Sequence, residues 1–318
     1  RGGLRGGERR DGPARRSRRT RGETIQEVGD RPGVRIVAHH GPQTSAVATR
    51  RAPLDRGSGS VTHTGPVAEH REIVVVGGGA MGSAAAWQLA GRGRQVTLLE
   101  RFGARHTMGA SHGRSRNFNI TYEKPAYAVL LHEAARLWRE LEHDSGTPLL
   151  ELVGIVNHGA GVRPDLADVL GALGFQASML APEEANERWA GIRFDTRVLF
   201  SPDGGRLDAD EAVVALQSEA VRHGGEVLLQ TPVVEVRPRS DDRVEVVTDD
   251  TTYLAETVVV TAGAWTERLL GPSAVALPPM VVTEEQPAHF AVLDPTFDWP
   301  GWNHMPAPDE ARYDYWHA

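Results

Sequence analysis

The 318-residue sequence contains no cysteine, which excludes disulfide bridges, thiolate metal sites and a cysteine nucleophile from it. Lysine is nearly absent as well, because Lys124 is its single occurrence. Apolar runs are short, and none approaches the ~20 residues that a transmembrane helix needs. We therefore expect no membrane partner. The lack of cysteine is compatible with the reducing cytoplasm, which is the localisation we expect.

Charge is unevenly placed along the chain, whose formal net charge is −7. The segment 1–22 carries nine arginines against Glu8 and Asp11, so the remainder is strongly acidic. An acidic body does not favour nucleic-acid binding, and we expect no nucleic-acid partner. No group of residues has the spacing of metal ligands, so we expect no metal site.

Residues 1–70 are rich in Arg, Gly, Pro, Ser and Thr and show no sustained apolar period. Ordering costs roughly 1–2 kcal/mol of backbone entropy per residue, and this stretch has little apolar surface to bury in return. We predict a disordered extension, either a linker or a mistranslated upstream segment. Its RGG sequences leave RNA binding open. Its arginine pairs leave an export signal or a transit peptide open, although no apolar region follows them.

The segment 73–100 reads IVVVGGGAMGSAAAWQLAGRGRQVTLLE. The β-branched run Ile73–Val76 predicts a buried parallel strand, and Val96–Leu99 predicts a second one. The alanine-rich stretch from Ala80 to about Arg92 predicts a helix between them. Glycines in G-x-G-x-x-G spacing join the first strand to the helix. This strand–turn–helix–strand context is the fingerprint of a dinucleotide-binding fold.

Each part of this motif has a physical role. Gly77 permits the tight turn, Gly79 lets backbone amides approach a pyrophosphate, and Gly82 lets the helix pack on the sheet. The phosphates would lie at the helix N-terminus, where unpaired amides and the helix dipole favour an anion. Glu100 would accept hydrogen bonds from ribose hydroxyls and would repel the 2′-phosphate of NADP, which Arg101 would partly offset. The predicted cofactor-binding residues here are Gly77, Gly79, Ala80, Met81, Gly82, Glu100 and Arg101.

Beyond this motif the chain alternates between helix and strand patterns. Helices are expected at Pro125–Leu141, Leu166–Leu173, Pro182–Trp189 and Asp208–His223, the last with Asp208 as N-cap. Strands are expected at Leu150–Val156, Glu226–Leu229, Val233–Val236, Val244–Val247 and Thr257–Thr261. The alternation predicts an α/β fold, in which a Rossmann-type domain with a parallel sheet is interrupted by a partial α+β domain.

Two further segments sharpen this prediction: TMGASHGRSRNFNITY at Thr107–Tyr122 and TVVVTAGAW at Thr257–Trp265. Together with the glycine motif, and in the same order, they resemble the flavin-dependent amine oxidases of the D-amino-acid oxidase superfamily. The resemblance is greatest to the branch of monomeric sarcosine oxidase and N-methyl-tryptophan oxidase. LWRELE at Leu137–Glu142 and SPDGGRLDADEAV at Ser201–Val213 are also similar to that branch. The resemblance implies FAD as the cofactor.

The resemblance also implies residues beside the flavin ring. These are Ser111, His112, Ser115 and Arg116. Arg116 and His112 would be the catalytic residues, and the Arg116 guanidinium would stabilise negative charge that develops as the flavin accepts a hydride. The resemblance further places Ala262 and Gly263 under the pyrophosphate and ribityl chain. It places the backbone of Val233 beside the adenine.

The sequence departs from this branch at several points. Asn119 stands where sarcosine oxidases carry an arginine that helps to bind the substrate carboxylate. An uncharged amide contributes ~1 kcal/mol to such a contact rather than about 1.5–3 kcal/mol, which counts against sarcosine as the substrate. The cysteine of the covalent flavin link, the oxygen-activating lysine and the second glycine-rich flavin-binding stretch have no counterpart, since Lys124 lies in another segment.

We therefore expect a chain truncated inside its substrate domain. The expected division is a disordered extension over 1–70, a FAD-binding domain over 71–150 and 201–272, a substrate-domain insertion over 151–200, and the start of a truncated substrate domain over 273–318.

The resemblance implies oxidation of the C–N bond of a secondary amine or N-methyl amino acid by hydride transfer to flavin. Hydrogen peroxide is the expected co-product, the partner is a small-molecule amine or amino acid, and the protein is expected to be a monomer. Two alternatives stay open. One is an NAD-linked dehydrogenase built on the same glycine motif, although such a domain does not need the segment 107–122. The other is an inactive, truncated FAD-binding fragment.

Overall fold

The computed structural model describes residues 68–271, 277–284, 288, 296 and 298–307. All helices and strands named below belong to one compact unit, formed by Ser60–Val282 and Phe297–Ala318. The predicted extension lies outside the described residues up to residue 67.

The first strand, β1 (Glu69–Val76), begins before the predicted domain boundary at Arg71. Glu69 and His70 were predicted to lie in the extension, but they pair in register with Tyr253 and Leu254 on a neighbouring strand. Because backbone pairing orders residues whose side chains are exposed, the polar composition of this stretch concealed the start of the strand.

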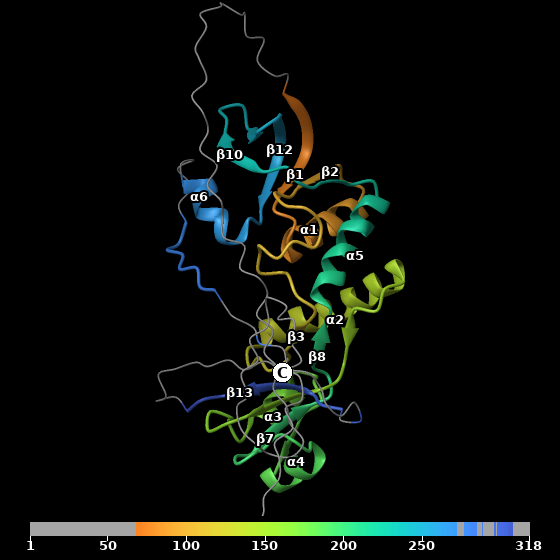
Figure 1. Ribbon diagram of the computed structural model, residues 1–318, viewed down its shortest axis with the longest axis vertical. Helices are drawn as coiled ribbons and strands as arrows, with labels where there is room; N and C mark the ends of the chain where they lie inside the picture. The colour runs from red at the N-terminus through yellow and green to blue at the C-terminus, as the bar shows by residue number, and fades with distance from the viewer. Residues whose placement is uncertain (1–67, 272–276, 285–287, 289–295, 297, 308–318) are drawn as a thin grey trace, which may run out of the picture. The chain divides into compact units, whose positions relative to one another are not determined.

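A six-stranded sheet forms the centre of the glycine-motif part, in the order β10-β11-β12-β1-β2-β9 (Figure 1). Its remaining strands are β2 (Val96–Leu99), β9 (Glu226–Leu228), β10 (Val233–Pro238), β11 (Val244–Thr248) and β12 (Thr252–Val260). β12, β1, β2 and β9 are parallel, whereas β10, β11 and β12 form an antiparallel ribbon at one edge. The parallel strands confirm the predicted α/β fold.

Two helices cover this sheet beside the glycine motif. Figure 1 shows α1 (Ala80–Gly91) and α5 (Ala209–Arg222) side by side. Small side chains along α1 allow close contact, and Ala86 and Leu216 pack with Val75 and Leu98 in one buried cluster. As predicted, Asp208 caps α5, since its carboxylate accepts a hydrogen bond from the Glu211 N–H at 3.1 Å.

Two smaller sheets follow the glycine-motif part. One has the order β13-β5-β7-β6 and the other has the order β3-β8-β4. Their strands are β3 (Arg116–Phe118), β4 (Leu150–Glu151), β5 (Ile155–His158), β6 (Ser178–Leu180), β7 (Val198–Ser201), β8 (Gly205–Leu207) and β13 (Gly301–His304). The other helices are α2 (Pro125–Ser145), α3 (Leu166–Ala172), α4 (Pro182–Arg188), η1 (Gly263–Trp265) and α6 (Thr266–Leu270).

Two of the predicted strands differ from the structure by more than two residues in their extent. The predicted strand Leu150–Val156 is two strands, β4 and β5, which belong to different sheets. Gly154 separates them with φ of +81°, and a Cβ there would lie 2.6 Å from the Phe200 ring. The predicted strand Thr257–Thr261 starts earlier, at Thr252, because its first residues pair with β11. None of the helices in the described ranges is both long enough and apolar enough to cross a bilayer.

Candidate cofactor site

The glycine loop between β1 and α1 brings backbone atoms into direct contact. Gly77 has φ of +107°, and a Cβ there would lie 2.5 Å from the Thr261 carbonyl oxygen. A Cβ on Gly82 would lie 1.9 Å from the Gly77 carbonyl oxygen. The left-handed backbone and these short distances mean that the fold accepts only glycine at both positions.

Side chains from α1, α5 and the end of β2 hold the peptide groups of Gly78. Its N–H donates to Glu100 Oε2 at 2.6 Å. Its carbonyl oxygen accepts from the Ser83 hydroxyl and from Gln217 Nε2, each at 2.9 Å. Sequence reasoning missed Ser83 and Gln217. Each of them is a polar residue on a helix whose other buried positions are mostly small or apolar, but the sequence does not show that the two helices meet.

The N-terminus of α1 offers backbone donors to an anion. Gly79 is the N-cap and provides no side-chain cap, and the first turn holds no acidic residue. The Ala80 N–H donates to Ser111 Oγ at 3.0 Å, and a Cβ on Gly79 would lie 3.1 Å from the same oxygen. The Met81 side chain is exposed. Gly79, Ala80 and Ser111 are thus brought together at the positive end of the helix dipole.

Glu100 is buried beside this loop, at 6% exposure. Besides Gly78, its carboxylate accepts from the Phe102 N–H at 2.8 Å, and Oε1 lies 3.5 Å from His106 Nε2. His106 Nδ1 accepts from the Met108 N–H at 3.3 Å, so the ring proton is on Nε2 and faces the carboxylate. The neighbouring Arg101 is exposed, with its guanidinium 5.6 Å from the Phe102 ring centre.

The loop that carries the predicted flavin-side residues is held by hydrogen bonds between its own side chains and its backbone carbonyl groups. Arg116 Nη2 donates to the carbonyl oxygens of Ala110 at 2.6 Å and His112 at 2.8 Å, and Nη1 donates to Ser115 at 3.0 Å. His112 Nδ1 lies 2.5 Å from the Gly109 carbonyl oxygen, which makes Nδ1 the protonated nitrogen. The Arg116 and Ser115 side chains are exposed, and that of His112 is partly buried.

Contacts to α5 anchor the same loop. Gly113 N–H donates to Asp210 Oδ1 at 2.8 Å, and Arg105 forms a two-bonded ion pair with Glu211 at 2.7 and 2.9 Å. This pair raises the pKa of Arg105 and lowers the pKa of Glu211, because each charge is hydrogen-bonded to the other. The predicted residues Ser111, His112, Ser115 and Arg116 therefore stand on one loop that is fixed at both α1 and α5.

The remaining predicted residues lie at the ends of β-strands. The Ala262 nitrogen would be 3.1 Å from a Cβ on Gly77, so Ala262 belongs to the same loop contact as Thr261. Gly263 follows it with φ of +52°. Val233 opens β10, and the chain just before it is tied to Glu100 through a Thr231 N–H···O=C bond of 2.8 Å.

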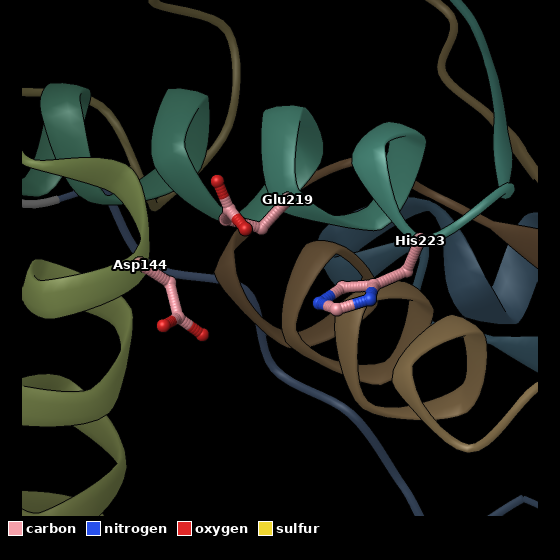
Figure 2. A group of neighbouring side chains, drawn as sticks. All are labelled: Asp144, Glu219 and His223. Atoms are coloured by element: carbon pink, nitrogen blue, oxygen red, sulfur yellow. The ribbon is translucent and has the colours of Figure 1, made fainter.

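A second group of chemistry-bearing side chains joins α2 to α5 (Figure 2). Asp144, Glu219 and His223 each bring one ligand atom within 4.8 Å of the others. Arg222 Nε donates to Glu219 at 2.6 Å, and Arg222 Nη2 lies 3.8 Å from Asp144. The guanidinium already supplies the positive charge between the two carboxylates. The group is therefore an ion-paired helix contact.

The glycine loop fits the diphosphate of a dinucleotide. Its close contacts leave no room for a side chain at Gly77 or Gly82, and the start of α1 has a glycine as its N-cap and no acid in its first turn. A buried carboxylate, Glu100, follows the second strand at the expected distance along the chain. These three features are typical of a site that binds an anion flanked by a sugar.

Comparison with known proteins gives consistent matches. A family model described as FAD dependent oxidoreductase matches residues 72–317. Peroxisomal sarcosine oxidase of Mus musculus is 34% identical over 212 residues, which are 65% of this chain and 54% of that protein. Monomeric sarcosine oxidase of Streptomyces avermitilis is 35% identical over 208 residues, covering 63% of this chain and 53% of that protein. The chain thus spans about half the length of the curated relatives it matches.

Solved structures agree with the fold. NikD, described as an unusual amino acid oxidase essential for nikkomycin biosynthesis, matches with a TM-score of 0.64 and 26% identity, covering 78% of this chain and 65% of that one. L-proline dehydrogenase from P. horikoshii shares the fold with a TM-score of 0.58 and 21% identity, covering 66% of this chain and 57% of that one. The predicted resemblance is confirmed: the chain belongs to the family of FAD dependent oxidoreductases.

Proposed function

We propose that this chain binds FAD at the glycine loop and oxidises the C–N bond of a secondary amine or N-methyl amino acid, with hydrogen peroxide as co-product. The observation that carries the proposal is the backbone cradle at Gly77 and Gly82, next to the N-terminus of α1, where the N-cap residue Gly79 has no side chain. The names of the relatives support the substrate class, since they include sarcosine oxidases and an N-methyl-L-tryptophan oxidase.

The chain's own groups would bind and orient the cofactor, while FAD, when bound, supplies the two-electron acceptor. The amides at the start of α1 would bind the diphosphate, and the Ser111 hydroxyl, which accepts from Ala80, keeps its proton for a phosphate oxygen. Glu100 would accept hydrogen bonds from ribose hydroxyls. Val233, Ala262, Gly263 and the loop with His112 and Ser115 remain proposed cofactor contacts.

Arg116 is the proposed catalytic residue with the clearest electrostatic basis. Its guanidinium donates to backbone carbonyls, and no acidic side chain in the described part of the chain forms an ion pair with it. Carbonyl groups orient the guanidinium without neutralising it, so its positive charge is kept for the negative charge that develops in the reaction. His112, whose carbonyl accepts from Arg116, would position it as well as face the cofactor.

The proposal includes a monomer, which the name of the Streptomyces relative states for that protein. It also includes a cytoplasmic location, with which the cysteine-free sequence is compatible. The alternative function is that of an FAD-binding fragment without turnover, favoured by the share of the relatives' length that the chain spans, 54% in the mouse protein.

The test is titration of the purified chain with FAD and, separately, with NAD. We expect a stable yellow complex with FAD and no comparable affinity for NAD. A folded chain without affinity for FAD would refute the proposal. A peroxide-coupled assay with sarcosine and N-methyl-L-tryptophan then separates the two functions: turnover supports the oxidase, and binding without turnover supports the fragment.

A further inference from the structure

A long loop, residues 100–115, joins the end of β2 to the start of β3. Its far end is fixed by a sheet, because Arg116 pairs with Leu207 of β8. Its middle, which contains Ser111, belongs to no strand or helix. The position of Ser111 therefore depends on the contacts that the middle of the loop makes with other elements.

The first turn of α5 makes two such contacts, and we call them together the α5 clasp. In one, the Gly113 N–H donates to Asp210 Oδ1 at 2.8 Å, and the Asp210 N–H donates to the Gly113 carbonyl oxygen at 3.1 Å. In the other, the Arg105 guanidinium donates to both carboxylate oxygens of Glu211, at 2.7 and 2.9 Å. The Asp210 N–H belongs to the first turn of a helix, whose donors have no partner within the helix, so the clasp also satisfies α5.

The loop needs this support because of its backbone conformation. Arg105 has φ of +56°, in the left-handed region that costs energy for a residue with a Cβ. Gly113 has φ of +111°, which glycine adopts readily. Strained backbone persists only where the surrounding contacts fix it. The two residues that α5 contacts are thus the ones at which the loop departs from the common backbone regions.

Ser111 connects the clasp to the glycine loop. It comes two residues before Gly113, and its Oγ accepts from the Ala80 N–H at 3.0 Å, in the first turn of α1. A Cβ on Gly79 would lie 3.1 Å from the same oxygen. The middle of the loop is therefore tied to α5 on one side and reaches the N-terminus of α1 on the other. A displacement of Gly113 from α5 would move Ser111 away from Ala80.

We propose that Asp210 and Glu211 are positioning residues, which hold Ser111 at the start of α1 and thereby set the affinity of the chain for its dinucleotide. This inference rests on the proposed function. A hydroxyl contributes fully to binding only when it is already held in place, because ordering a loop on binding costs free energy. Arg116 depends less on the clasp, since β8 already fixes its backbone.

The test is a double-mutant cycle of Ser111→Ala and Asp210→Ala, with FAD affinity measured by isothermal titration. Ser111→Ala should weaken FAD binding about tenfold, the weight of a hydrogen bond to a charged group. Asp210→Ala removes the acceptor of the Gly113 N–H and should weaken binding about fivefold. In the Ser111→Ala chain the same change should weaken it by less than about twofold, because the hydroxyl that the clasp positions is already gone.

Asp210→Asn separates the hydrogen bond from the charge. An asparagine keeps an oxygen that can accept from the Gly113 N–H, but it removes the negative charge that the N-terminus of α5 favours. We expect this variant to be less stable in urea and to keep the wild-type FAD affinity within about twofold. A loss of affinity equal to that of Asp210→Ala would refute the positioning role.

The ion pair of the clasp has a matched control on α2. Glu211→Gln removes one charge of the pair with Arg105 and should weaken FAD binding about threefold. Glu133 forms the same kind of two-bonded pair with Arg136, at 2.9 and 2.7 Å. Glu133→Gln should leave FAD affinity unchanged. Equal effects of the two substitutions would contradict a specific role for the clasp.

The outcomes separate this inference from the proposed function. If the wild-type chain does not bind FAD, the proposed function fails and the inference falls with it. If FAD binds and the effects of Ser111→Ala and Asp210→Ala simply multiply, the inference alone is refuted, because Asp210 would then act on the fold and not through Ser111. Urea denaturation of each variant shows that the chain is folded under the conditions of the titration.

Discussion

The glycine loop and a second polar network, which we call the amide relay, are both close-packed structures, but they are held in opposite ways. The amide relay is a series of side chains joined by hydrogen bonds: Asn117, Asn303, Asn157, Thr121 and Asn119. The loop depends on backbone groups and on missing side chains, since a Cβ on Gly82 would lie 1.9 Å from the Gly77 carbonyl oxygen. The relay depends on side chains, and every bond in it needs an amide or hydroxyl in one orientation. The loop requires positions without a Cβ atom, whereas the relay requires particular amide and hydroxyl side chains.

This difference bears on how each region tolerates change. A backbone cradle has no rotamers, so it fails abruptly when a methyl group is added. A side-chain network fails in steps, because each lost partner leaves a neighbour unsatisfied while the rest of the network persists. The two regions should therefore separate in experiments that measure folding and ligand binding side by side.

The largest effect is expected for Gly82→Ala. The added methyl group overlaps the Gly77 carbonyl oxygen and the Thr261 hydroxyl, which would be 2.5 Å away. We expect a loss of about 3 kcal/mol in the free energy of unfolding, measured by urea denaturation, and loss of detectable FAD binding in the titration. Because the new methyl group clashes with backbone atoms, no change of side-chain rotamer can relieve the contact.

Gly91→Ala is the matched control, because Gly91 closes the same helix and its nearest neighbour, His223 Cδ2, would be 4.0 Å from the new Cβ. It should leave FAD binding unchanged and should stabilise the helix by about 0.5–1 kcal/mol. Equal FAD affinity in Gly82→Ala and Gly91→Ala would contradict the close-contact account of the loop.

The next effect concerns the other region. Asn157→Leu keeps the branched shape and the number of side-chain heavy atoms, but it leaves Nδ2 of Asn303 without its acceptor and Thr121 Oγ1 without its donor. We expect the free energy of unfolding to fall by about 2 kcal/mol, with FAD affinity changed by less than about twofold. Isothermal titration and urea denaturation of the same sample measure both. A parallel loss of FAD affinity would show that the two regions are not independent.

The glycine-loop region was largely predictable because its signals are local. The strand β1, the helix α1, the strand β2 and the Asp208 cap each follow from a short run of residues with one period or one capping residue. The braces at Ser83 and Gln217 were missed, because nothing in the sequence says which faces of α1 and α5 meet.

The relay region was mostly unpredictable for a different reason. Its strands β3, β5 and β13 are short, and Gly154 divides the apparent strand before β5 between two sheets. The side chains of Asn117 and Thr121 find their partners, Asn303 and Asn157, far away in the sequence. Pairing of β5 with β13 follows from tertiary packing, which composition and period do not specify.

A smaller effect is expected where a side chain braces the backbone loop. Gln217→Leu removes the donor from Gln217 to the Gly78 carbonyl oxygen, which still accepts from Ser83. Since one partner remains, we expect a loss of about 1 kcal/mol in stability and a rise of about threefold in the FAD dissociation constant. Gln88→Leu, on the neighbouring helix α1, is the control and should change neither. No change in FAD affinity for Gln217→Leu would mean that Ser83 alone fixes this peptide.

The last effect is a pH dependence of the free energy of unfolding, which arises at His158 on β5, the strand that also carries Asn157. Burial lowers the pKa of His158, and the neighbouring His304, whose Nδ1 is 3.3 Å from His158 Nε2, lowers it further, while Asp195 acts in the opposite sense. The unfolded chain, in which a histidine has a pKa of about 6.5, binds this proton more readily than the folded one. The contribution of His158 to the free energy of unfolding is therefore fully present above about pH 6.5, and it is lost as the pH falls below that value.

His158→Gln removes this titration and should flatten the decline between pH 7.5 and 5.5 by up to about 1.4 kcal/mol per pH unit below the unfolded pKa, as measured by urea denaturation at each pH. Identical slopes in wild type and His158→Gln would show that protonation of His158 beside His304 does not lower the free energy of unfolding. The protonation of His158 would then not affect stability, and the glycine loop and the sheet that carries His158 would differ only in their packing and hydrogen bonds.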